Sequence, residues 1–402
     1  SSSSSSRSRS SSSRRKQGNN SGGIGAGTCD GGSHDSSGGD GSIQVGGVAS
    51  LHRVLSEHGV DFSGHLLTKS DCKAISYTLR HHAESVRQVS LRDCGVDGES
   101  GVDLLKSLLG CGNLNALNLA GNQLTAENMT LVSEIITNNS DTLTSVRLDH
   151  NAIGDAGLQR LEDSLYHCKN VVVLGLGQCA LTSNSLSTLA RIIDRCRMVN
   201  CINIEQCRID DLGLQQNLEM PLARCSLHAL NLHKNDLTAR CGKALSHILS
   251  FSDQLTRLNL RFNALGDQGL LDIADAVKSC TQLVIVLLEG TKLTSKSLRP
   301  LTDMIGKWER LRALDLNTND FSGGGSARSH RHHEAATAAT AFARAIHRHP
   351  TLSELQLPCM AKVSDHLHLT LIKNSRPGLS VYLNSKPLLC DLDSTESLSI
   401  ST

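Results

Sequence analysis

Asp149, His150 and Glu205 are the residues of this sequence whose types could carry acid–base chemistry. A carboxylate can orient a neighbouring histidine, and a second carboxylate can exchange a proton with the ring. Hydrolysis or group transfer also needs a nucleophile in register with these residues, and none recurs beside them. We therefore expect no catalytic residues and no enzymatic activity.

The histidines near the C-terminus are the residues whose types could bind a metal ion. His330, His332 and His333 lie close together, with His347 and His349 further on. Imidazoles are common zinc ligands, but the surrounding Gly, Ser and Arg residues favour a mobile basic loop. Such a loop is an alternative site for an acidic partner or a phosphate. We therefore expect no bound metal.

Two further motifs that would imply a metal or cofactor are missing. The 14 cysteines include no CxxC pair, which disfavours a zinc ribbon. Gly242 and Lys243 are followed by alanine, so the phosphate-binding pattern GxxxxGK[ST] does not occur. We expect no cofactor and no small-molecule substrate.

Composition excludes several classes of partner. The 402 residues include 40 basic and 39 acidic side chains, and this balance gives no electrostatic reason to bind nucleic acid or an anionic membrane. No stretch approaches the roughly 18 apolar residues that cross a bilayer, and no signal peptide is recognisable. Cysteines at repeated positions indicate reduced thiols, and hence a cytoplasmic protein.

The elements that would position these residues follow from a repeated pattern. Four apolar residues recur with offsets of 0, 3, 5 and 10, and we call the first of them position 0 of a unit. The period is 28 residues, once 29, and a degenerate tenth unit begins at Leu352. Nine registered matches indicate a repeat architecture. The nine units begin at Val86, Leu114, Leu143, Val171, Val199, Leu227, Leu255, Leu283 and Leu311.

Each unit combines a strand with a helix. Positions 3 and 5 lie on the same side of a short strand, whereas positions 15, 18 and 22, such as Leu158, Leu161 and Leu165, lie on one face of a helix. A helix is about 10 Å wide and strands lie about 4.8 Å apart. The fold class is therefore an α/β solenoid, a horseshoe with a parallel sheet on the concave face and helices on the convex face.

Position 8 predicts a structural ladder of side chains at the turn that follows each strand. An asparagine there can donate to backbone carbonyls that the turn leaves unpaired, and a cysteine is a small, weak donor that tolerates burial. A second set of cysteines lies three residues before the next unit, a position shared with Trp308, and indicates packing rather than redox chemistry. The ladder residues are Cys94, Asn122, Asn151, Cys179, Cys207, Asn235, Asn263 and Asn319.

The solvent side of the sheet and its rim form the candidate protein-binding surface. Phe262, beside Arg257 and Arg261, is its best anchor, because aromatic residues and arginine dominate interface energetics. Two alternatives are a solvated face with no partner and a Phe262 ring folded onto its own turn. The candidate residues are Arg147, Asp149, His150, Glu205, Arg208, His233, Lys234, Asp236, Arg257, Arg261, Phe262, Glu289, Lys292 and Asp315.

The expected domain boundaries follow the repeats. Residues 1–50, rich in Ser, Arg and Gly, predict disorder, with an arginine–serine arm that is phosphorylated or associates with RNA as the alternative. A cap or leading partial repeat covers 51–85, the nine units cover 86–351, a terminal repeat or cap covers 352–390, and a disordered tail covers 391–402. An insertion is expected at about 322–340.

The helix of the unit at 199 departs from the repeat. Pro221 should kink this helix, and its apolar positions are shifted by one residue, so that Leu214, Leu218 and Leu222 should pack in the core.

Two segments carry a family resemblance. The segment 67–72 (LTKSDC) resembles the pattern LTxxDC, and the segment 148–157 (LDHNAIGDAG) resembles an internal repeat, of the leucine-rich repeats of NOD-like receptors. The whole pattern, LxxLxLxx(N/C)xL followed by a helix, resembles the ribonuclease-inhibitor-like class of these repeats. The resemblance covers roughly 60–360 and implies the ligand-sensing or regulatory region of an innate immune receptor that binds a protein on its concave face. The alternatives are a RanGAP-type activator of a small GTPase and an inhibitor or cytoskeletal scaffold.

Overall fold

The computed structural model describes residues 55–56, 59–96, 98–277, 280–321, 329–358, 378–383 and 386–387. All of these residues fall in one compact unit, residues 36–402. The segments 1–50 and 391–402, for which the sequence predicts disorder, lie outside the described residues.

One 14-stranded sheet connects the described units in sequence order. β2 to β13 run parallel, while β1 and β14 add antiparallel edges. In β5, Val146 pairs with Leu117 and Leu174, the same position of the neighbouring units. The strands are β1 Leu55–Ser56, β2 Gly59–Asp61, β3 Gln88–Ser90, β4 Ala116–Asn118, β5 Ser145–Arg147, β6 Val173–Gly175, β7 Cys201–Asn203, β8 Ala229–Asn231, β9 Arg257–Asn259, β10 Ile285–Leu287, β11 Ala313–Asp315, β12 Glu354–Leu357, β13 Ser380–Leu383 and β14 Lys386–Pro387.

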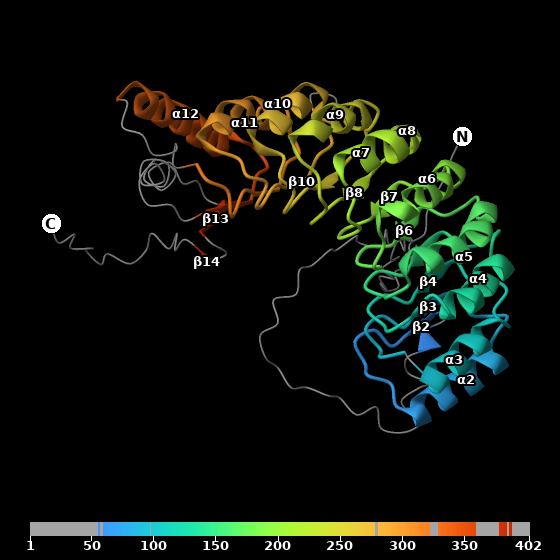
Figure 1. Cartoon of the computed structure of the whole chain (residues 1–402). Helices are drawn as coiled ribbons and strands as arrows, with labels where there is room; N and C mark the ends of the chain where they lie inside the picture. Colours follow the sequence, from blue (N-terminus) through green and yellow to red (C-terminus); the bar gives the residue numbers. More distant parts are fainter. Residues whose placement is uncertain are drawn as a thin grey trace, which may run out of the picture. The chain divides into compact units, whose positions relative to one another are not determined.

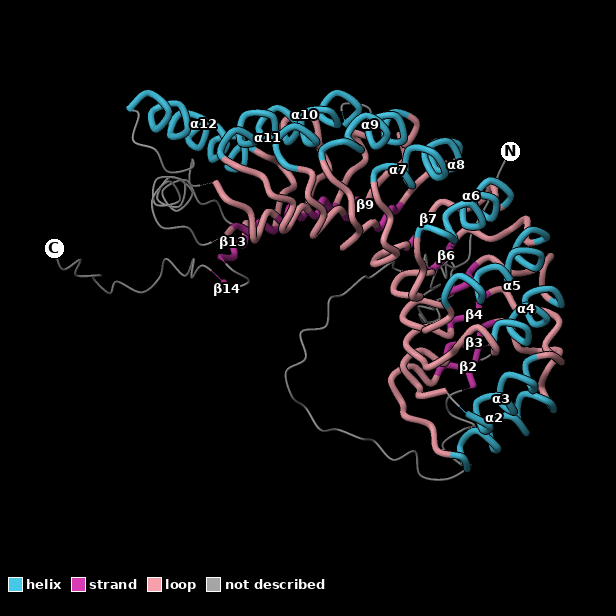
Figure 2. The backbone as a smooth tube through the Cα atoms, in the orientation of Figure 1, coloured by secondary structure: helices cyan, strands magenta, loops and turns pink. Residues whose placement is uncertain are grey.

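The described helices all lie on one side of the sheet. The strands therefore form the inner side of the curve and the helices its outer side (Figures 1 and 2). The predicted α/β horseshoe solenoid is therefore confirmed. The α-helices are α2 Lys69–His81, α3 Gly98–Leu108, α4 Asn128–Asn138, α5 Gly154–His167, α6 Leu186–Arg195, α7 Asp211–Gly213, α8 Glu219–Arg224, α9 Gly242–Ser250, α10 Gly266–Val277, α11 Leu298–Ile305 and α12 Ser329–Arg348. Short 3₁₀ turns are η1 Ser183–Ser185, η3 Ala239–Cys241 and η4 Ser295–Ser297, and η2 Leu214–Leu218 is a π-helical turn.

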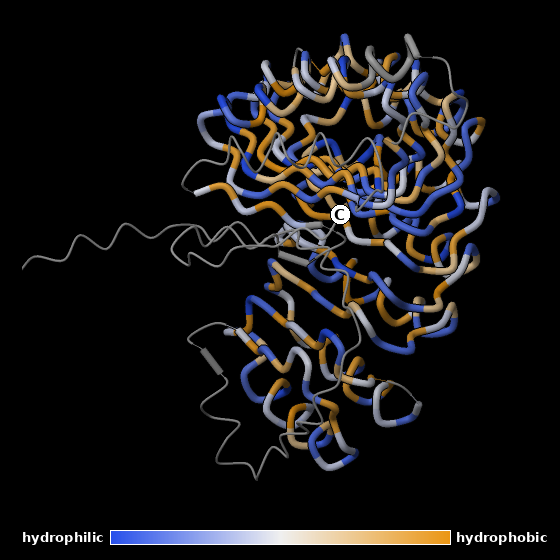
Figure 3. Tube along the Cα trace, turned by 90° about the vertical axis from the view of Figure 1, so that its left-hand side faces the viewer, coloured by the Kyte–Doolittle hydropathy of each residue, from blue (hydrophilic) through white to orange (hydrophobic). Residues whose placement is uncertain are grey.

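The core is a continuous aliphatic layer between the sheet and the helices. In the unit at 143, Leu143, Val146 and Leu148 from the strand side and Leu158 and Leu161 from the helix are fully buried. Figure 3 shows these apolar segments recurring from one turn of the solenoid to the next. Each layer packs only on its neighbours. The core therefore grows longer with each added unit and needs no contacts between units that are far apart in the chain.

The ladder at position 8 holds the turns together. Nδ2 of Asn151 donates to the carbonyl oxygens of Leu119 and Leu148, both at 2.9 Å, and its Oδ1 accepts from the Leu124 N–H at 3.1 Å. Where the position is cysteine, the thiol of Cys179 donates to the carbonyl of Leu148 at 3.2 Å. Each ladder side chain thus bonds its own turn to the preceding unit, so its loss leaves buried backbone groups unpaired.

The leading segment also belongs to the sheet. β2 pairs with β3, and α2 begins at Lys69 with Thr68 as its N-cap. The Thr68 side chain accepts from the Asp71 N–H while the Asp71 carboxylate accepts from the Thr68 N–H, a reciprocal capping box. Ile75 and Leu79 of α2 are buried in the core.

A second period, two units long, was not predicted from the sequence. In alternate interfaces an aspartate at position 12 receives two hydrogen bonds from a threonine of the next unit. The Thr182, Thr238 and Thr294 N–H groups donate to Asp155, Asp211 and Asp267 at 2.8, 2.7 and 2.8 Å. Each of these threonines caps a 3₁₀ turn that leads into the helix of its unit. Two kinds of unit therefore alternate.

The slip near Pro221 is taken up by a π-helical turn. The N–H of Glu219 donates to the carbonyl of Leu214, five residues earlier, so the turn Leu214–Leu218 holds one extra residue. Leu214, Leu218 and Leu222 are consequently all buried. Pro221 is the third residue of α8, which continues from the π-helical turn without a break.

The expected basic loop at 322–340 is wrong from Ser329 onward, because α12 begins there. The segment is rich in alanine, the strongest helix former, and Ala339, Phe342 and Ile346 are fully buried at helical spacing. Ile346 lies six residues before Leu352, as Ile305 lies six before Leu311. The additional residues of this unit therefore lie before the packed part of its helix. In the described part of the chain, no helix is long and apolar enough to cross a membrane.

Candidate functional site

Each unit presents its positions 2, 4 and 6 to the concave face. A strand of three residues places positions 2 and 4 on that face and buries position 3, as the pattern of Ser145, Val146 and Arg147 shows. Position 6 follows directly after the strand. The candidate surface is therefore a grid whose rows are positions and whose columns are units.

Position 7 forms the rim of this grid and has left-handed backbone geometry in all nine units. Seven of these residues are not glycine, among them His150 (φ 57°), Lys234 (φ 53°), Phe262 (φ 53°) and Thr318 (φ 57°). The conformation is held by the next unit: the Phe262 N–H, for example, donates to the Glu289 carbonyl at 2.8 Å. Such backbone strain persists only when its surroundings fix it, so the rim side chains leave the sheet at defined angles.

Glu205 is the centre of the first cluster on the concave face. Its carboxylate accepts from Asn231 Nδ2 at 2.9 Å and lies 3.4 Å from His150 Nε2 and from His233 Nδ1. Gln178 Nε2 adds a contact at 3.3 Å. Although burial by itself would raise the pKa of Glu205, the hydrogen bonds from His150, His233 and Asn231 hold that pKa well below its usual range. The same contact raises the pKa of His150.

Asp149 is buried beside this cluster because the neighbouring unit carries glycine at two concave positions. A side chain at Gly175 would place Cβ 2.1 Å from Asp149 Oδ2, and one at Gly177 would place it 2.6 Å from Glu205 Cγ. Asp149 Oδ1 instead accepts from the Gly177 N–H at 2.9 Å and from Asn203 Nδ2 at 2.8 Å. Burial raises the pKa of Asp149, against the opposing effect of the Gly177 N–H.

Arg261 is the centre of the second cluster. Its Nε donates to Asp315 Oδ2 at 2.9 Å and lies 3.4 Å from Glu289 Oε2. Asp315 is 1% exposed, so this ion pair is almost wholly removed from water. Burial and the neighbouring Asp315 raise the pKa of Glu289. Arg261 is thereby fixed inside the molecule rather than extended toward solvent.

Phe262 lies above this cluster with 43% of its surface exposed. Its ring covers Gly290 of the next unit, where an added Cβ would lie 2.7 Å from Phe262 Cδ1. Its centroid is 5.5 Å from that of His233, in a tilted arrangement. The ring therefore packs on the following unit rather than on its own turn, and its outer part faces solvent.

The remaining candidates divide by exposure. Arg208, Lys234, Asp236 and Lys292 are exposed on the rim, while Arg147 and Arg257 are half-buried on the concave face. Three candidates are buried and hydrogen-bonded within the protein: Asp149, Glu205 and Asp315. Repeat position alone does not predict this burial. For the first cluster, the sequence signal was the pair of glycines at concave positions of one unit, Gly175 and Gly177.

No described group of three or more His, Cys, Asp or Glu residues could hold a metal ion. The side chains of His330, His332 and His333 lie outside the described residues. His349 is buried, and its Nε2 lies 2.8 Å from the carbonyl oxygen of Trp308.

The cysteines that share the position of Trp308 are packing residues. Like Trp308, they are fully buried: Cys111, Cys168, Cys196 and Cys280. Burial raises the pKa of the Cys196 thiol to about 12, as expected for a packing residue.

Several known proteins are similar to this chain. A family model described as Leucine Rich repeat matches residues 139–161 and 254–274. NACHT, LRR and PYD domains-containing protein 3 of Bos taurus is 31% identical over 281 residues, which are 67% of this chain and 26% of that protein. Ribonuclease inhibitor of Sus scrofa is 26% identical over 259 residues, which are 63% of this chain and 56% of the inhibitor. An internalin of known structure from Listeria monocytogenes has a TM-score of 0.46 at 12% identity, over 83% of this chain and 88% of that one.

These matches cover only part of each relative, which limits the properties of the relatives that can be inferred for this chain. The chain spans about a quarter of the length of the NACHT, LRR and PYD domains-containing relatives, 26% in Bos taurus and 26% in Homo sapiens. The similarity therefore concerns the repeat region of those proteins. Proteins built on this repeat are typically non-enzymatic scaffolds.

Proposed function

Since the chain is a ribonuclease-inhibitor-like leucine-rich-repeat protein similar to the repeat region of NOD-like receptors, we propose that it is the ligand-sensing or regulatory region of such a receptor. It binds a protein partner on its concave face and catalyses no reaction. The proposal places it in the cytoplasm, in accord with described cysteines that form no disulfide.

The half-exposed ring of Phe262 carries this proposal. An aromatic side chain that is already held in place loses little conformational freedom on binding, and aromatic anchors supply much of the binding energy of protein interfaces. Phe262 is held by Gly290 and by the ring of His233. Exposed Lys234 and Lys292 lie on the same rim and supply the polar surroundings that such an anchor needs.

The buried charges support binding in a second way. Arg261 is bound to Asp315, and Glu205 is bound to Asn231 and two histidines. These contacts fix the floor beneath Phe262 before any partner arrives. A rigid floor reduces the ordering cost of association, and this gives the buried carboxylates a supporting rather than a contacting role.

The rival functions have less support. A RanGAP-type activator needs an arginine or asparagine on the rim of an early unit. Arg92 and Arg147 are candidates, but no described contact marks either for that role; Arg92 only meets the adjacent Asp93, Nε to Oδ2, at 2.9 Å. No particular arrangement of described residues favours an inhibitor or a cytoskeletal scaffold over a receptor region.

Site-specific photo-crosslinking in cells tests the proposal. A benzophenone amino acid replaces Phe262 on the concave rim or, as a matched aromatic control, Tyr77, which is 66% exposed on α2 of the convex side. We expect a discrete crosslinked protein from position 262 and not from position 77. With that protein purified, Phe262→Ala should weaken binding at least tenfold, about 1.4 kcal/mol. Equal crosslinking from both positions, or unchanged affinity of the variant, would show that the binding face is elsewhere.

A further inference from the structure

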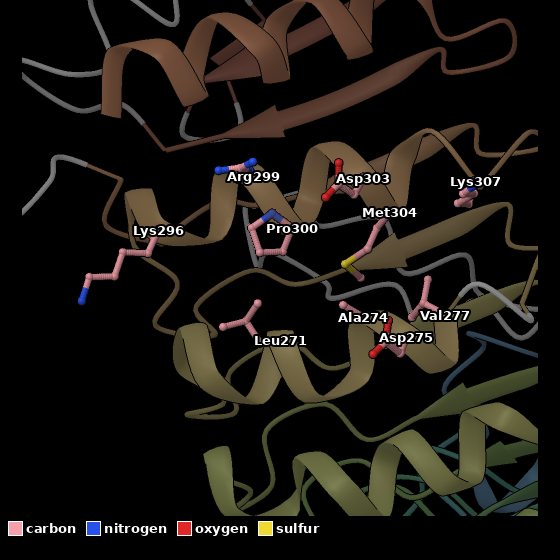
Figure 4. Close-up of a pocket in the computed structure, with 10 residues that line it drawn as sticks. All are labelled: Leu271, Ala274, Asp275, Val277, Lys296, Arg299, Pro300, Asp303, Met304 and Lys307. Carbon is pink, nitrogen blue, oxygen red and sulfur yellow. The ribbon is translucent and has the colours of Figure 1, made fainter. Parts of the chain in front are cut away.

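A furrow between α10 and α11 on the convex side is separate from the concave face. Its volume is about 620 Å³. Ala274, Val277, Pro300 and Met304 contribute apolar surface to it, and Leu271, 49% exposed, lies at its mouth (Figure 4). The furrow is therefore an apolar channel between two helices of successive units.

Ion pairs link neighbouring helices elsewhere on the convex side. Glu162 of α5 pairs with Arg191 of α6, with Oε2 2.9 Å from Nη2. Glu219 Oε1 of α8 lies 2.9 Å from His247 Nδ1 of α9, an ion pair when that imidazole is protonated. Arg191, Glu219 and His247 all occupy position 20 of their units. Position 20 is thus a point where adjacent helices attract each other.

The α10–α11 pair has the opposite arrangement at position 20. Its residues are Asp275 and Asp303, two acids in consecutive units. Like charges at neighbouring positions repel rather than attract. Both carboxylates line the furrow from opposite walls (Figure 4). Ala274 adds only a small side chain to the space between them.

Basic side chains flank the two acids. Lys296 and Arg299 lie at one end of the furrow and Lys307 at the other (Figure 4). All three are exposed, and within the part of the chain that the structure describes no ion pair joins any of them to an acid. Arg299 and Asp303 lie four residues apart on α11, which is about 6 Å along a helix. Lys307 lies in the turn just beyond the end of α11, so this wall presents a basic, an acidic and a basic side chain in order.

We propose that this furrow is a second protein-docking site, which takes an amphipathic helix of a partner. The helix places an apolar stripe on Ala274, Pro300 and Met304. It carries acidic, basic and acidic side chains at four-residue spacing, opposite Arg299, Asp303 and Lys307. The pattern is the same in both directions, so the charges allow either helix orientation.

The two carboxylates separate this partner from a polyanion. A nucleic acid or an anionic bilayer would meet the three cations favourably but would bring phosphates against Asp275 and Asp303. A helix with a central lysine between two acids pairs with Asp303, Arg299 and Lys307. The furrow is short, about two to three helical turns, so the complex belongs to the weak, transient class of interfaces.

Two labelled peptides test the proposal with the full chain. Both are 16-residue helices with a leucine stripe; one carries Glu, Lys, Glu at four-residue spacing beside it, and the other carries Lys, Glu, Lys. Circular dichroism confirms equal helicity. By fluorescence anisotropy, the Glu-Lys-Glu peptide should bind at least tenfold more tightly than its charge-reversed control. Vesicles of anionic phospholipid should not bind to the chain.

A charge-swapped protein locates the site. The triple variant Arg299→Glu, Asp303→Lys, Lys307→Glu changes only exposed side chains, and it should prefer the Lys-Glu-Lys peptide. The control variant Asp103→Lys, Lys106→Glu alters another exposed helix pair, on α3, and should keep the original preference. Equal binding of the two peptides, no binding at millimolar concentration, or a preference that survives the triple variant overturns the proposal, as does tight vesicle binding.

Discussion

Replacing Glu205 is the sharpest perturbation of the concave face, because its carboxylate joins its own unit to three others. In Glu205→Ala, Asn231 Nδ2 loses its acceptor at 2.9 Å, and His150 and His233 lose theirs at 3.4 Å. A hydrogen bond to a charged group contributes about 1.5–3 kcal/mol, and the histidine contacts are long. We expect the free energy of unfolding to fall by about 2–4 kcal/mol, and Glu205→Gln, which keeps an amide oxygen, to lose about half as much.

The pH dependence of this effect follows from the two pKa shifts. The pKa of Glu205 is lowered, so its contribution is present above the ordinary carboxyl value of 4.5 and is lost as pH falls through the folded-state pKa. The pKa of His150 is raised, so its contribution is present below 6.5 and is lost as pH rises through the folded-state pKa. The difference between wild type and Glu205→Ala should be largest between these two ordinary values and should decline at higher pH.

Equilibrium urea unfolding between pH 4 and pH 8 measures the stability, and NMR titration follows the imidazole of His150. In Glu205→Ala the pKa of His150 should move down toward its ordinary value. Glu127→Ala serves as a control, because Glu127 is exposed and surface substitutions change stability by less than about 0.5 kcal/mol. A loss below about 0.5 kcal/mol at pH 6, or an unmoved His150 titration, would refute the role assigned to Glu205.

Three further outcomes are expected. Asn151→Ala should destabilise the fold by about 2–3 kcal/mol in urea unfolding, because two carbonyls and one N–H lose their partner; a neutral effect would contradict the ladder. Gly177→Ala should cost about 1–3 kcal/mol by overpacking against Glu205 and Asn203, whereas Gly112→Ala, which has open space, should cost less than about 0.5 kcal/mol. Burial raises the pKa of Cys207 to about 12, so its alkylation at pH 8, followed by mass spectrometry, should be undetectable until the protein unfolds; rapid labelling would show that this turn opens.

The repeat could be predicted from sequence because its signal is local. Each unit contains its own strand and helix pattern, and contacts within the core join residues one unit apart. Prediction failed at one place where the regularity breaks. The loop expected at 322–340 becomes helical at Ser329, because we gave its Arg and His residues more weight than its alanines. The one-residue slip expected near Pro221 is taken up by a π-helical turn that keeps Leu218 buried.

The candidate binding surface could be predicted only as a set of positions. Position numbers place Asp149, Glu205 and Phe262 on the concave face or its rim. They do not show that the first two are buried and the third exposed. That outcome depends on how large the side chains of neighbouring units are: Gly175 and Gly177 admit Asp149 and Glu205, and Gly290 supports the ring of Phe262.

The sequence by itself determined the architecture, since a solenoid with a fixed period has one way to bury its apolar positions. Tertiary structure alone decided how Asp149, His150 and Glu205, the three residues with acid–base side chains, are arranged and buried. Asp149 bonds to Asn203, and Arg261 to Asp315, each 54 residues away. Curvature brings side chains of alternate units together on the concave face, and no period in the sequence records which of those side chains then exclude water from one another.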